Sequence, residues 1–228
     1  MTVIGSKIID YLRLFQTPGS GIHINMEDFP SLTEEDVSST WKSWTFNLEK
    51  LAHIFFKKDG FTEYPHKDSK CYQRAICFWL VANVFTDPEE DNPEYTKEKY
   101  LEDVKETIHI IQRRIQGKKI IDYLTLLASE DKYKDYDELD LSRYAWLEGS
   151  DIDGCTSKDN AFEVCSLISE FFDTKSEDDE KYYKGCCYVR TSSYICGNCF
   201  GTPNYPYEKH LEDVKETIET INLIVDHI

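Results

Sequence analysis

The sequence predicts an all-α protein made of two tandem, related helical-bundle domains that are stapled by disulfides. The main observation is an internal repeat: residues 101–108 return unchanged as 211–218, and residues 7–12 return as 119–124. Apolar residues recur at helical spacing in these segments, whereas strand patterns are short and weak. The cysteines divide into two in the first copy and six in the second, so each copy can close its own disulfides.

The repeats place the first domain at residues 1–116 and the second at residues 117–228. Each copy opens with Lys-Ile-Ile-Asp-Tyr-Leu and closes with a segment that begins Leu-Glu-Asp-Val, and each has the size of an ordinary domain. Gly117 lies at the junction. The last helix of the first copy either continues through Gly117 or breaks there, and the sequence favours neither alternative.

Helices are expected in the same order along each copy. The opening helices have three apolar residues on one face: Ile8, Leu12 and Phe15, and Ile120, Leu124 and Leu127. A second helix is expected at about residues 32–57, after a capping sequence, with its counterpart at about 157–173. Another helix is expected over 77–85. The clearest strand signal, residues 188–191, is too short to carry a sheet alone.

The closing helices are amphipathic. Their apolar residues follow alternating steps of three and four: Leu101, Val104, Ile108, Ile111 and Ile115, and then Leu211, Val214, Ile218, Ile221 and Val225. We expect this stripe to face the core, and Glu102, Asp103, Lys105 and Glu106 mostly to face water. We therefore expect each copy to form a bundle of four or five helices.

The formal net charge of −17 and the pI of about 4.7 argue against two classes of partner. Nucleic-acid binding needs clustered Lys and Arg, and anionic membrane surfaces attract basic rather than acidic proteins. We therefore expect no nucleic acid and no membrane as partners, and we interpret the charge as a source of solubility. No catalytic motif assembles from the six histidines, so we expect neither an enzyme nor a cofactor.

The cysteines indicate the compartment. The predicted disulfide residues are Cys71, Cys77, Cys155, Cys165, Cys186, Cys187, Cys196 and Cys199. Adjacent cysteines at 186 and 187 are costly to keep reduced in a cytosolic protein, which favours a secreted, oxidised protein whose leader has been removed. Six cysteines in the second copy allow 15 pairings, and none is preferred.

A bond between Cys71 and Cys77 has a geometric consequence. Six residues of helix separate two Cα atoms by about 9 Å, beyond the disulfide limit of about 7 Å. A bonded pair therefore excludes a straight helix between these cysteines. In the second copy, the spacing of Cys196 and Cys199 is also that of a zinc knuckle, with His210 further along. Because Cys186 and Cys187 are wrongly spaced for a second ligand pair, we expect disulfides and no metal.

Each copy also holds a segment rich in cysteine and tyrosine before its closing helix. Counting back from Leu-Glu-Asp-Val without a gap, Cys77 aligns with Cys187 and Tyr72 aligns with Tyr182. In this alignment Cys71 has no cysteine partner. In order along the chain, the segments are Cys71, Tyr72 and Cys77 in the first copy, and Cys187, Tyr188 and Cys196 in the second.

A chain with two such Cys-Tyr-Cys segments resembles the BICYCLE proteins, secreted salivary-gland effectors of aphids that are linked to gall formation. The resemblance covers the paired layout of nearly the whole chain, although the spacing differs between the copies. It implies delivery in insect saliva into plant tissue and action there through binding an unknown host protein. Two alternatives remain: a secreted helical carrier of a small apolar ligand, and an intracellular zinc-stabilised adaptor.

Overall fold

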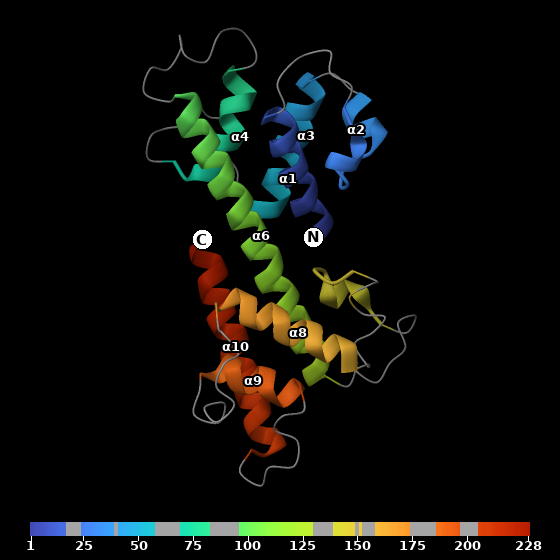
Figure 1. The fold of residues 1–228 in the computed structure, drawn as a ribbon, viewed down its shortest axis with the longest axis vertical. Coiled ribbons are helices and arrows are strands. Elements are labelled where there is room, and N and C mark those ends of the chain that lie inside the picture. The colour runs from blue at the N-terminus through green and yellow to red at the C-terminus, as the bar shows by residue number, and fades with distance from the viewer. Residues whose placement is uncertain are drawn as a thin grey trace. The chain divides into compact units, whose positions relative to one another are not determined.

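A computed structural model gives the fold, and the prediction of an all-α protein is confirmed (Figure 1). The structure describes residues 1–16, 24–38, 41–57, 69–82, 96–129, 139–148, 151, 158–173, 186–196 and 205–228. These residues form eight α-helices and two short 3-10 helices, with no strand among them. Within the same residues, no helix is both long enough and apolar enough to span a membrane.

The chain forms two compact units. The first contains Met1 and Val3–Gln112, and the second contains Thr2 and Arg113–Ile228. One helix, α6 (Lys97–Ala128), contributes to both units and continues through Gly117 without a break. The alternative of an unbroken helix at this position is therefore the one that the structure adopts. The domain boundary between residues 116 and 117 stays a prediction from the repeat.

The first unit packs its helices around Leu12, Leu48 and Phe55, which are at most 1% exposed. Besides the start of α6, its elements are α1 (Thr2–Gln16), η1 (Met26–Asp28), α2 (Glu34–Ser38), α3 (Trp41–Phe56) and α4 (Cys71–Ala82). The single helix expected over 32–57 is wrong, because two helices, α2 and α3, occupy this range. The helix expected from Cys77 begins six residues earlier, at Cys71.

The second unit has an apolar core centred on Ile120, Leu124, Phe171 and Ile221. Its further elements are η4 (Leu141–Tyr144), α8 (Lys158–Phe171), α9 (Cys187–Ile195) and α10 (Tyr207–His227). The weak strand signal at 188–191 lies inside α9, so this segment is helical in the structure. Its β-branched and aromatic residues fit a helix here because α9 packs against α8 and α10.

Both units hold their opening helix with the same kind of ion pair. Lys7 Nζ lies 2.7 Å from Asp36, and Lys119 Nζ lies 2.9 Å from Asp151. Each of these aspartates also accepts a backbone N–H three residues earlier, at 2.8 Å and 2.7 Å respectively. Burial raises the pKa of Asp36, but the hydrogen bond from Lys7 and those from Thr33 outweigh it and leave the pKa lowered.

Gly117 allows α6 to approach the helices of the second unit closely. A Cβ at this position would lie 2.7 Å from Val225, 2.9 Å from Phe171 and 3.0 Å from Ile221. All three side chains are at most 1% exposed, so they have little room to move away. Packing therefore explains this glycine within a long helix, where it would otherwise only lower helix stability.

Replacing Gly117 with alanine should destabilise the protein. The gain in helix propensity is about 1 kcal/mol, whereas overpacking a full core costs about 1–3 kcal/mol. Because a valine methyl and an aromatic ring bear the clash, we expect a net loss of about 1 kcal/mol in urea unfolding. Gln112→Ala, at an exposed position of the same helix, is the control and should change stability little. A Gly117→Ala protein as stable as the wild type would contradict this account of the core.

Candidate functional site

The cysteine-tyrosine segments begin equivalent helices in the two units. α4 starts at Cys71 and contains Tyr72 and Arg74, and α9 starts at Cys187 and contains Tyr188 and Arg190. The shared pattern is therefore Cys-Tyr-x-Arg, and it pairs Cys71 with Cys187. The alignment of Cys77 with Cys187 and of Tyr72 with Tyr182 is wrong, because the arginine precedes its aspartate by 29 residues in one unit and 23 in the other.

Each arginine of this pattern makes a bidentate ion pair with the closing helix. Arg74 donates to Asp103 of α6 from Nε at 2.7 Å and from Nη2 at 2.6 Å. Arg190 donates to Asp213 of α10 from the same two nitrogens, at 2.7 Å and 2.5 Å. Both aspartate side chains are 0% exposed, so the expectation that Asp103 faces water is wrong. The paired charge is what makes this burial possible.

Further donors surround the buried aspartate of the second unit. Tyr205 donates its hydroxyl to Asp213 at 2.5 Å, and Lys209 lies 3.2 Å from the other carboxylate oxygen. Burial raises the pKa of Asp213, but hydrogen bonds from Arg190, Tyr205 and Lys209 outweigh it and bring the pKa to about 2. The carboxylate therefore stays charged over the physiological pH range.

The tyrosines of the same pattern belong to stacks with the helix that precedes them. Tyr72 stacks on Phe56 with ring centroids 4.3 Å apart, and Tyr188 stacks on Phe172 at 3.9 Å. In each unit the stacked phenylalanine also meets its neighbour edge-on, at 5.1 Å and 79°. Such stacks stabilise the packing of helices. Tyr72 and Tyr188 are thus structural, while Tyr182 lies outside the described residues.

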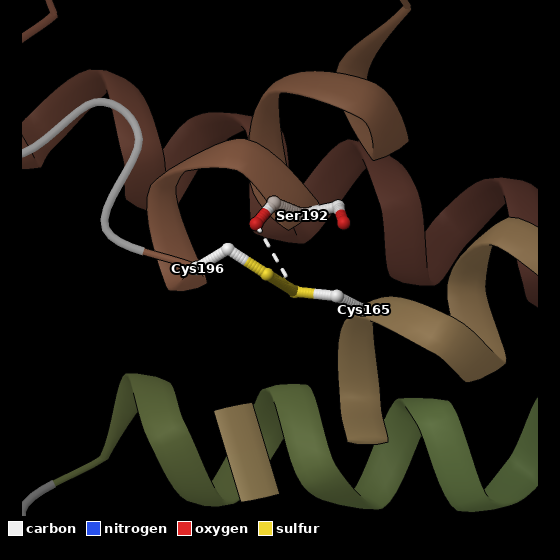
Figure 2. Close-up of a disulfide and its surroundings, with 3 residues drawn as sticks. All are labelled: Cys165, Ser192 and Cys196. Carbon is white, nitrogen blue, oxygen red and sulfur yellow. Dashed lines mark hydrogen bonds between the residues drawn. A yellow bond between two sulfur atoms is a disulfide. The ribbon is translucent and has the colours of Figure 1, made fainter. Parts of the chain in front are cut away.

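One disulfide joins two helices of the second unit. Cys165 of α8 is bonded to Cys196, which follows α9, and the Cys165 sulfur lies 3.2 Å from the Ser192 carbonyl oxygen (Figure 2). A cross-link between residues 31 apart contributes about 3–4 kcal/mol in the chain-entropy model. The first unit has Glu49 where the second has Cys165, so this bond is specific to the second unit. Cys155 and Cys199 lie outside the described residues.

Four of the cysteines predicted to form disulfides are not disulfide-bonded in the structure: Cys71, Cys77, Cys186 and Cys187. Cys71 and Cys77 are six residues apart in one helix, α4, so their Cα atoms are about 9 Å apart and a bond between them is excluded. Burial and then the charge of Glu106 raise the pKa of Cys71 to about 11. Burial and then the charge of Glu49 raise the pKa of Cys77 to about 12.

The zinc knuckle considered for the second copy is not formed by the residues that the structure places. The sulfur of Cys196 is bonded to that of Cys165 in a disulfide, so it is not available as a zinc ligand. Within the described ranges, no group of three or more His, Cys, Asp and Glu side chains converges as a metal site would require. His210 instead packs among aromatic rings.

These rings form a cluster that the sequence analysis did not identify. We define this aromatic cluster as four residues: Tyr194 of α9, Tyr205, which precedes α10, and Tyr207 and His210 of α10. The His210 ring stacks on Tyr194 at 3.9 Å, and Tyr207 lies 6.4 Å from Tyr194 and 6.1 Å from His210. His210 is 5% exposed, whereas Tyr207 is 41% exposed. The cluster thus has a buried base and an open edge. Its sequence signal is the close spacing of Tyr205, Tyr207 and His210 at the start of the closing helix.

Comparisons with protein-family models, with curated proteins and with solved structures found no match to this chain.

Acidification should unfold the protein partly through Asp213. Its pKa is about 2 in the folded state against an ordinary 3.8, so its stabilising effect is present above pH 4 and is lost as the pH falls to 2. The loss amounts to at most about 2 kcal/mol. Asp213→Asn should lower stability at neutral pH and reduce the further loss between pH 4 and pH 2. Urea unfolding at several pH values measures both effects. Glu212→Gln, an exposed neighbour, should keep the wild-type pH dependence; an unchanged slope in Asp213→Asn would contradict the assignment.

Alkylation should separate the thiols by burial. In the native protein without reductant, iodoacetamide should modify exposed Cys186 well before Cys71 and Cys77, whose thiolates are disfavoured by burial. In denaturant all three and Cys187 should react, while Cys165 and Cys196 should react only after reduction. Peptide mass spectrometry measures each site. A denatured protein in which Cys71 or Cys77 resists alkylation until it is reduced would show that these cysteines are oxidised.

Proposed function

We propose that this protein is a secreted, non-enzymatic effector that acts by binding a host protein in plant tissue. The compartment and host are those implied by the resemblance to the salivary BICYCLE effectors, and the disulfide between Cys165 and Cys196 is compatible with an oxidising environment. Binding as the mode of action is supported by a comparison of the contacts within each unit, because some contacts occur in both units and others in only one.

The contacts shared by both units explain the fold. The Arg–Asp pairs, the Tyr–Phe stacks and the Lys–Asp pairs occur in each unit and connect one helix to another. Most of these groups are buried or half-buried, so they have little surface left to offer a partner. A surface for recognition is therefore best sought among contacts that only one unit has.

The single observation that carries the proposal is the aromatic cluster at one end of α9. It adjoins the disulfide-bonded Cys196, which follows α9 directly and limits the movement of this helix end. An exposed tyrosine on a rigid base is a typical anchor of protein interfaces, because it buries a large area at low entropic cost. The second unit thus offers a preorganised surface for a partner.

The test is capture of host proteins by immobilised protein in plant extracts, with quantitative mass spectrometry. The wild type should enrich a defined host protein, and Tyr194→Ala combined with Tyr207→Ala should lose it. Leu223→Ala is the matched control, since Leu223 is 63% exposed on the same helix, α10, and lies outside the cluster. Direct binding should then be measured with the purified host protein.

Two results would refute the proposal. The first is enrichment no greater than that of an unrelated acidic protein of similar size. The second is equal capture by the wild type and by the double tyrosine variant, with circular dichroism showing that the variant is folded.

A further inference from the structure

The aromatic cluster lies in an acidic surrounding. Glu208 and Glu212 are exposed on α10, one and five residues after Tyr207, and the side chain of Glu212 is 73% exposed. Two cations of α9 and α10 are engaged in ion pairs: Lys209 contacts Glu212 at 3.4 Å, and Arg190 is held by Asp213. The whole chain carries a net charge of −17. The electrostatic potential at the open edge of the cluster is therefore negative.

Aromatic faces add to this preference. The face of a tyrosine ring carries the negative part of its quadrupole, so it attracts an ammonium or guanidinium group placed over it. One local effect opposes a cation, because α10 begins at Tyr207 and the dipole of its first turn is positive. Glu208 in that first turn and Glu212 one turn later offset the dipole. The balance of the site favours a cationic ligand.

The first unit lacks the same chemistry at the equivalent place. Position 207 of the second unit corresponds to Lys97 in the repeat, and position 210 corresponds to Tyr100. A lysine in place of the exposed tyrosine would repel a cation and remove its aromatic platform. The difference between the units is thus a difference in the charge of the ligand that each can accept.

We propose that the aromatic cluster and the exposed carboxylates of Glu208 and Glu212 dock a basic segment of a protein partner, with an arginine or lysine side chain over Tyr207. This inference rests on the proposed function and names the chemistry of its partner. One basic side chain of the segment contacts the Tyr207 face, and further basic side chains pair with Glu208 and Glu212, which are four residues apart on one face of α10. Charge complementarity with the acidic chain brings the segment to the surface.

The experiment titrates the full-length protein with a fluorescent peptide of alternating arginine and glycine, followed by anisotropy at low and moderate salt. The matched peptide carries citrulline, which keeps the shape of arginine without its charge. Tyr207→Lys gives the second unit the residue of the first. Glu212→Gln is compared with Glu102→Gln, since both glutamates are similarly exposed, at 73% and 71%, and each has a lysine three residues earlier at 3.4 Å and 3.5 Å.

We expect Tyr207→Lys to weaken binding at least about fivefold, the change that corresponds to the loss of one cation–π contact. Glu212→Gln should weaken it about twofold to fivefold, and Glu102→Gln should leave it unchanged. The citrulline peptide should not bind. A folded Glu212→Gln protein is assured by the exposure of this side chain, so the comparison does not depend on Tyr207→Lys alone.

Three results would overturn the inference. Equal weakening by Glu212→Gln and Glu102→Gln would show diffuse attraction to an acidic protein. Binding of the citrulline peptide as tight as that of the arginine peptide would show that the cluster takes neutral ligands. Failure of the arginine peptide to bind would exclude a basic partner, while host capture that is lost in the double tyrosine variant would still support the proposed function.

Discussion

The buried aspartate of each closing helix is the group on which the rest of its unit depends. Asp103 and Asp213 have no exposed surface. Their buried negative charges are compensated by the guanidinium group of an arginine. That arginine comes from the helix that begins with Cys-Tyr, so the ion pair sets the position of this helix against the closing helix. The neighbouring tyrosine then stacks on a phenylalanine that is the last residue of the preceding helix, α3, or directly follows it, as in α8. One charge pair thus organises three helices in each unit.

The same arrangement explains which parts of the fold the sequence predicts. The apolar stripe of the closing helices gives their position and their buried face, because 3.6-residue periodicity reports burial directly. It cannot report that Asp103 is also buried, since its partner, Arg74, lies 29 residues earlier in the chain. A charged residue beside an apolar stripe is ordinarily solvated. Only the tertiary pairing reverses that expectation.

The candidate site was harder to predict for a related reason. Counting back from the repeated segment assumes that the chain between Cys-Tyr and Leu-Glu-Asp-Val has the same length in both copies, but this stretch is six residues shorter in the second copy. The misalignment separated Cys71 from Cys187 and so concealed the Cys-Tyr-x-Arg pattern. Similarly, cysteine counting names disulfide candidates but cannot select Cys165 and Cys196, because that choice depends on how α8 packs against α9. Local strand propensity at 188–191 was overridden by the same packing.

Comparison of the two units separates the requirements of folding from the opportunities for binding. A contact present in both units is explained by the shared need to bury an aspartate or to end a helix. Exchanges at matched positions, such as Glu49 for Cys165 and Lys97 for Tyr207, lie outside the Arg–Asp, Tyr–Phe and Lys–Asp contacts that the units share. They give the second unit a cross-link at the end of α9 and an exposed ring at the start of α10. The cross-link and the exposed ring adjoin, so the second unit presents an aromatic surface that is already ordered by folding. The entropy lost on ordering this surface is therefore not lost again when a partner binds.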